Sequence, residues 1–159
     1  MQTQASPNTK PVAPNPWDFV RIVQMYGADG LARRYRALLP FVELLHHVGD
    51  PELLLKEHWY RSPQLSMSLA GLQAQWEDVR KPDALPWVAA QFWTRDLYML
   101  REVCKGAVTE APPPDARIMR DFVMPKSLNE YLDGSEFAAL VATLNRIGRL
   151  ELAAAGETL

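Results

Sequence analysis

Apolar residues recur at steps of three and four along most of this 159-residue chain, which is the spacing of helices that bury one face. Three such stripes stand out. They consist of Leu31, Tyr35, Leu38, Val42 and Leu45; of Leu65, Leu69, Leu72, Trp76 and Val79; and of Phe137, Leu140, Val141, Leu144 and Ile147. No run of alternating apolar and β-branched residues lies between turn signals, so the pattern predicts no strand.

Proline and cap residues predict where helices begin and end. Asn15-Pro16 predicts the start of a first helix that ends near Gly27, because Asn is a good N-cap and Pro fits the first helical position. Pro40 lies about opposite the first apolar stripe, so we expect a kinked or broken helix that still faces one core.

These elements predict an all-α fold, namely a single-domain orthogonal or irregular bundle of about six to seven helices over residues 15–159. Residues 1–14 hold three prolines and no hydrophobic periodicity, which is typical of a disordered tail. A proline-rich loop over residues 107–114 separates a C-terminal helical third from the rest.

Composition narrows the class of protein. A formal net charge of −2 gives no broad attraction to nucleic acid or to an anionic membrane. Cys104 is the only cysteine, which suits a reducing compartment. No apolar run approaches the roughly 20 residues that span a bilayer, and the N-terminus resembles no secretory signal. We therefore expect a cytoplasmic protein without a membrane partner. Twelve of the seventeen basic residues are arginine, and alanine and leucine are abundant, which indicates a bacterial source.

An aromatic helical pair is the strongest fold signal. Four of the five tryptophans lie on or beside two amphipathic helices, over about residues 63–80 and 85–105; they are Trp59, Trp76, Trp87 and Trp93. An indole buries a large apolar area. We therefore expect Trp76 and Trp93 to be buried where the two helices meet.

Other aromatic residues of this region predict an interface. Trp87 and Tyr98 share the polar side of the second helix if that helix is regular, and Met67 lies opposite the apolar stripe of the first. Clustered exposed aromatic residues mark protein interfaces. The predicted interface residues are Trp59, Tyr60, Met67, Trp87 and Tyr98.

Asp96 is the most unusual carboxylate. On a regular helix over residues 85–105 it projects from the middle of a wide apolar arc. Burial of a carboxylate is costly unless it is paired. We therefore expect Asp96 to be mostly buried and to accept at least one strong hydrogen bond. A catalytic acid or base is the alternative interpretation.

The histidines do not have the spacing of a metal site. His46 and His47 are adjacent, so on a helix they diverge by about 100°. His58 lacks a second ligand at the i, i+4 spacing of helical zinc motifs. We expect surface or boundary histidines, with no metal and no cofactor. A site built from His46 and His58 with Glu57 or Asp96 is the alternative.

A basic run over Arg33, Arg34 and Arg36 surrounds Tyr35. Arginines beside an aromatic ring can follow a phosphate backbone while the ring stacks on a base. Tyr35 is also required by the first apolar stripe, however, and such a run in an acidic protein is usually a solvated face.

These observations favour a non-catalytic helical interaction protein, such as an adaptor or the small accessory subunit of a heteromeric bacterial enzyme. Its partner would be another protein subunit or a second copy of the same chain. Two alternatives stay open. One is a nucleic-acid-associated regulator that uses the Arg33–Arg36 segment, and the other is an enzyme with a buried Asp96/His site.

Overall fold

The computed structural model describes residues 12–48, 57–112 and 122–157, and these residues form helices and no strand. The predicted all-α fold class is therefore confirmed. The elements in chain order are α1 (Phe19–Ala37), α2 (Leu39–Val48), the 3₁₀ turn η1 (Trp59–Arg61), α3 (Pro63–Val79), α4 (Pro86–Gln91), the π-helical turn η2 (Phe92–Asp96), α5 (Leu97–Gly106), α6 (Leu128–Leu132) and α7 (Ser135–Glu157).

The helices join into fewer units than the six to seven predicted. Within the described ranges they make five helical units and one 3₁₀ turn, because α1, which has a corner at Gly27, is followed by α2 after one residue, and α4 runs through η2 into α5. Pro40 and the π turn alter the helices locally without ending them.

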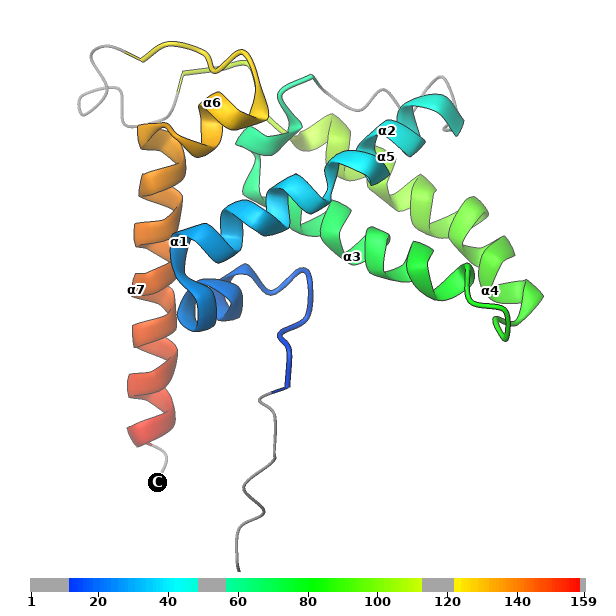
Figure 1. The fold of residues 1–159 in the computed structure, drawn as a ribbon, viewed down its shortest axis with the longest axis horizontal. Coiled ribbons are helices and arrows are strands. Elements are labelled where there is room, and N and C mark those ends of the chain that lie inside the picture. Colours follow the sequence, from blue (N-terminus) through cyan, green and yellow to red (C-terminus); the bar gives the residue numbers. More distant parts are fainter. Residues whose placement is uncertain (1–11, 49–56, 113–121, 158–159) are drawn as a thin grey trace, which may run out of the picture.

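Figure 1 shows two arms around a central diagonal helix. The long C-terminal helix α7 packs across α1 on one side, and the short α6 packs on α7. On the other side, α3 packs on α5 and forms a hairpin with the α4–η2–α5 helix. The C-terminal third is therefore packed on the N-terminal helix. Residues 107–112 of the predicted loop are not helical, and residues 113–114 lie outside the described ranges.

The first helix begins three residues later than the Asn15-Pro16 signal predicts. Residues 15–18 form a turn in which the Asp18 amide donates to the Asn15 carbonyl at 3.0 Å. Asp18 is the actual N-cap, since its carboxylate accepts from the Arg21 amide. The predicted stop near Gly27 is confirmed as a sharp corner inside α1, where Gly27 has φ +71° and ψ −165°. Only glycine adopts this backbone readily.

The core is centred on Tyr35, which is fully buried. Its ring contacts those of Phe19, Trp59, Tyr131 and Phe137, with centroid distances of 5.4 to 6.3 Å. Burial raises the pKa of Tyr35 to about 12. Its hydroxyl has no hydrogen bond of good geometry, although the Ser66 and Tyr131 hydroxyls lie beside it.

The first two predicted stripes agree with the observed burial, whereas the third is buried only in part, since Phe137 and Leu144 are buried and Ile147 is 36% exposed. All five residues of the first stripe are buried, and so are Leu65, Leu69 and Leu72 of the second. Ser62 caps α3, because its hydroxyl accepts from the Leu65 amide at 3.3 Å. Of the described helices, none is long and apolar enough to cross a membrane.

Candidate interaction surface

Large apolar side chains lie exposed on the α4–η2–α5 helix. Trp87 is 62% exposed and Tyr98 is 54% exposed. Together with three neighbours they form what we call the hairpin surface, which consists of Leu85, Trp87, Trp93, Tyr98 and Met99. Helix α4 has no buried residue, so this part of the molecule adds little to the core.

The π turn explains why Trp93 and Met99 are exposed. In η2 the Leu97 amide bonds to the Phe92 carbonyl five residues back, so one extra residue enters the helix. Each residue after the turn takes the direction that its predecessor would have in a regular helix, a rotation of about 100°. The buried positions accordingly step by five across the turn; they are Phe92, Leu97, Leu100 and Cys104.

The expected burial of both hairpin tryptophans is therefore wrong for Trp93, which is 39% exposed. Its ring lies edge-on against Trp76 at 5.5 Å. Trp76 is half-buried and packs against the core. The same rotation separates Trp87 and Tyr98 by about 80° around the helix, where a regular helix would place them about 20° apart.

Trp59 and Tyr60 do not belong to the hairpin surface. Each is only 4% exposed, because η1 places both rings in the central core against Tyr35 and Tyr131. Their place among the predicted exposed interface residues is a correction. Met67 is half-buried and packs on the core as well. Of the five predicted interface residues, Trp87 and Tyr98 are the exposed ones.

Asp96 lies at the end of the π turn. Its side chain is 17% exposed, which agrees with the expected burial. The expected strong hydrogen bond is not seen, because the donor is Nε of the exposed neighbour Arg95 at 3.3 Å. Asp96 lines a cavity of about 510 Å³ between the N-terminal segment, α3 and α5. Trp17, Asp78 and Met99 also line this cavity, whereas no histidine does. The cavity adjoins the hairpin surface through Met99.

The basic run does not form one surface. Arg34 is half-buried and donates to the Pro16 carbonyl and to Gln73 of α3. Arg36 is exposed and reaches Asn129 of α6 at 3.4 Å. Arg33 is also exposed. The Arg34 and Arg36 guanidinium groups therefore reach different elements, because residues two apart on a helix diverge by about 160°.

The three histidines do not come together in one site. His46 and His47 are exposed near the end of α2. His58 is largely buried, and its Nδ1 lies 2.6 Å from a Glu110 carboxylate oxygen. Among the described residues, no group of three or more His, Cys, Asp or Glu side chains could hold a metal ion. The alternative site of His46, His58, Glu57 and Asp96 is thus not assembled in this part of the chain.

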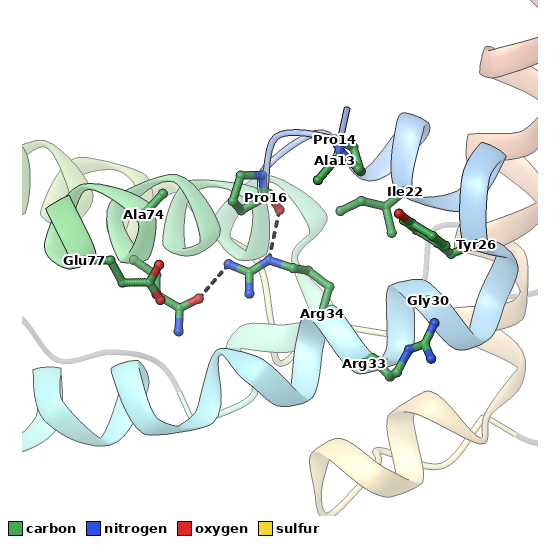
Figure 2. Close-up of a pocket in the computed structure, with 11 residues that line it drawn as sticks. Ala13, Pro14, Pro16, Ile22, Tyr26, Gly30, Arg33, Arg34, Ala74 and Glu77 are labelled. Atoms are coloured by element: carbon green, nitrogen blue, oxygen red, sulfur yellow. Dashed lines mark hydrogen bonds between the residues drawn. The ribbon is translucent and has the colours of Figure 1, made fainter. Parts of the chain in front are cut away.

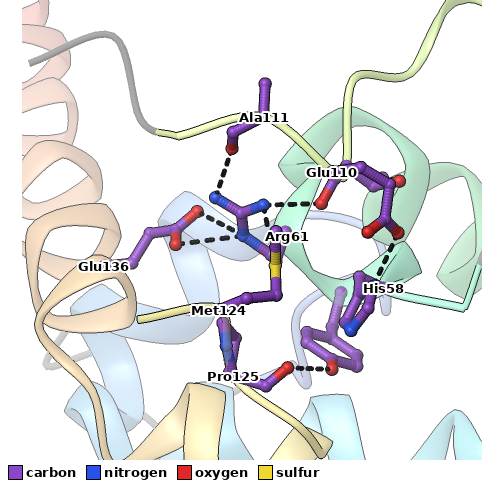
Figure 3. Close-up of polar contacts among 9 residues, drawn as sticks. His58, Arg61, Glu110, Ala111, Met124, Pro125 and Glu136 are labelled. Carbon is purple, nitrogen blue, oxygen red and sulfur yellow. Dashed lines mark hydrogen bonds and ion pairs between the residues drawn. The ribbon is translucent and has the colours of Figure 1, made fainter. Parts of the chain in front are cut away.

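The principal buried charge, Arg61, was missed by the sequence analysis. Figure 3 shows its guanidinium surrounded by acceptors from three segments. Arg61 Nε donates to both Glu136 carboxylate oxygens at 3.2 Å. The two Nη atoms donate to the Thr109 carbonyl at 2.6 Å and the Ala111 carbonyl at 2.8 Å. Nη1 also reaches Met124 Sδ at 3.1 Å.

This Arg61 cluster is a structural clamp. It joins η1 to the 109–111 loop, to the segment before α6 and to the start of α7. The guanidinium also lies over the Phe122 ring, with Cζ 4.9 Å from the centroid. Arg61 lies just outside the periodic helices, so no hydrophobic stripe marked it. Its partners are up to 75 residues away in sequence, which explains why spacing gave no signal.

Comparison of the chain with protein-family models, with curated proteins and with solved structures found no match.

Proposed function

We propose that this chain is a helical interaction protein that works by contact, such as an adaptor or a small accessory subunit of a heteromeric bacterial enzyme. The observation that carries the proposal is the hairpin surface, where five large apolar side chains are 39% to 62% exposed on one hairpin. Exposed tryptophan and tyrosine side chains are typical of protein–protein contacts.

The position of these side chains on the fold supports the proposal. Helix α4 has no buried residue, so its side chains are free to pack against another polypeptide. The cavity beside Asp96 extends the apolar surface, since Met99 belongs to both. A π turn within a helix frequently occurs at functional sites, and here it turns Met99 outward. The partner in this proposal is another protein subunit or a second copy of the chain.

The test is a charge-inserting double variant, Trp87→Glu with Tyr98→Glu. Both side chains are more than half exposed, so the variant should unfold at the same urea concentration as the wild type. It should lose self-association in sedimentation velocity, or lose the partner that the wild type binds in solution. A partner would have to bury the aromatic rings, and a buried unpaired carboxylate is costly.

A matched control lies on the other arm. Leu150 and Leu152 of α7 are 64% and 63% exposed, so Leu150→Glu with Leu152→Glu adds the same charge to equally exposed apolar positions. We expect this control to keep the association. A wild-type chain that is strictly monomeric and binds no partner contradicts the proposal, and so does an association that only the α7 variant abolishes.

A further inference from the structure

A second cavity lies between α1, α3 and the N-terminal segment (Figure 2), and it adjoins the Asp96 cavity at Pro16 and Ala74. Its volume is about 390 Å³, which falls in the usual range for small-molecule sites. The corner at Gly27 shapes it by folding Tyr26 back over the following turn of α1. A Cβ atom at Gly30 would overlap the Tyr26 Cβ, so this close approach requires glycine at position 30.

The polar end of this cavity is the Arg34 guanidinium. Nε donates to the Pro16 carbonyl at 3.1 Å, and Nη2 donates to Gln73 Oε1 at 2.6 Å. Both acceptors are neutral, and the ion pairs of the described residues include none to Arg34. Burial lowers the pKa of Arg34, while the Glu77 carboxylate raises it by a smaller amount. A half-buried cation with neutral partners is only partly compensated.

The rest of the lining is mainly apolar. Pro14, Pro16 and Ile22 form one wall, and the exposed Tyr26 ring forms the side across from Arg34 in Figure 2. Arg33 lies at the edge, where it adds positive charge without closing the cavity. A mainly apolar pocket with a few charged groups at one end is an arrangement that orients a small amphipathic ligand.

We propose that this cavity binds a small monocarboxylic acid with a compact apolar or aromatic body. The carboxylate pairs with the Arg34 guanidinium, and the body lies against Ile22 and Tyr26. Glu77 at the α3 wall repels a second negative charge, which disfavours phosphate esters and dicarboxylates. The site does not overlap the hairpin surface, so it goes beyond the proposed interaction function.

The test uses phenylacetate as the probe, with phenylacetamide as an uncharged ligand of the same shape and phenylalanine as a zwitterion. Amide chemical shifts of the ¹⁵N-labelled protein report both location and affinity. We expect phenylacetate to shift Tyr26, Gly30, Arg34 and Gln73, and to bind about tenfold more tightly than phenylacetamide, since an ion pair to a guanidinium is a strong contact. Phenylalanine should bind at least as tightly as phenylacetate, because Glu77 attracts its ammonium, and binding weaker than that of phenylacetamide would contradict the proposal.

Three variants locate the interaction. Arg34→Gln should weaken phenylacetate binding about tenfold, and Glu77→Gln, at an exposed position, should tighten it about twofold. Arg36→Gln removes an equally charged side chain that points to α6, so binding should not change. The Glu77 result keeps the test valid even if Arg34→Gln fails to fold. Equal affinity for phenylacetate and phenylacetamide, or no shift at about 10 mM of either, overturns the proposal.

Discussion

Two aromatic clusters in this molecule have similar ring contacts and different degrees of burial. The first surrounds Tyr35, and every ring in it is at most 4% exposed; its members are Phe19, Tyr35, Trp59, Tyr60, Tyr131 and Phe137. The second joins Trp76, Phe92 and Trp93 in the hairpin, and only Phe92 is buried. Centroid distances are 5.2 to 6.3 Å in the first cluster and 5.3 to 5.6 Å in the second.

The difference lies in what covers each cluster. Tyr131 of α6 and Phe137 of α7 close the first cluster from a distant part of the sequence. The second cluster has no such cover among the described residues, and Trp76 lines an open hollow between α2 and α3. Ring contacts alone therefore do not make a core. A third element must exclude water from them.

The largest effect is expected at the centre of the closed cluster. Tyr35→Ala should lower the free energy of unfolding by about 3–5 kcal/mol, because a fully buried ring with four ring neighbours leaves a cavity. Trp93→Ala removes a larger ring from the open cluster and should cost only about 2 kcal/mol, since Trp93 is already 39% exposed. Urea unfolding of both variants measures the contrast. Equal losses would contradict the division into closed and open clusters.

The next effect concerns the clamp beside the closed cluster. Arg61→Met should cost about 3 kcal/mol, because it leaves the Glu136 carboxylate and two carbonyl groups without their donor in a buried place. Arg61→Met with Glu136→Leu should recover part of that loss, since both charges are then gone. Urea unfolding of the single and double variants tests this coupling. A double variant that is less stable than Arg61→Met alone would show that the pair is not the source of the cost.

The closed cluster also predicts a loss of stability in alkali. Burial raises the pKa of Tyr35 to about 12 and also raises that of Tyr131, whereas an unfolded tyrosine titrates near 10. Stability from each neutral ring is complete below about pH 10 and is lost as the pH rises toward the folded pKa, by about 1.4 kcal/mol per pH unit. Urea unfolding between about pH 9 and pH 11 measures the slope. Tyr35→Phe should reduce this slope by the contribution of one tyrosine. An unchanged slope would show that Tyr35 does not contribute to the loss of stability in alkali.

The sequence predicted the closed half of the molecule better than the open half. The first stripe from Leu31 to Leu45 is buried as the periodicity requires, because a regular helix translates spacing directly into a face. Arg61 was missed because its partners come from distant segments that only folding brings together. Trp59 and Tyr60 were expected on the surface because their burial depends on the Tyr131 and Tyr35 rings, which lie far away in sequence.

The prediction for the hairpin was wrong for a different reason. The predicted arc around Asp96 assumed 100° per residue throughout residues 85–105, and one extra residue in η2 breaks that rule. Nothing in the apolar pattern of Val88 and Phe92 before the turn marks where the extra residue enters. The pattern after the turn does mark it, since Leu97 lies five residues beyond Phe92 and both are buried.

The smallest effect is expected from removing that extra residue. Deletion of Thr94, an exposed residue inside the π turn, converts η2 into regular α-helix and leaves Leu97, Leu100 and Cys104 facing the core. The free energy of unfolding should change by no more than about 1 kcal/mol, because no buried side chain is lost.

Deletion of Ser68 in the regular helix α3 is the matched control. It turns Leu69 and Leu72 away from the core and should cost at least about 3 kcal/mol. If both deletions lower the free energy of unfolding equally, the π turn is not one extra residue that can be removed without disturbing the core. If Thr94 deletion is nearly neutral but weakens association of the hairpin surface, the turn serves the surface rather than the core, because it alters how Trp87 is oriented relative to Tyr98.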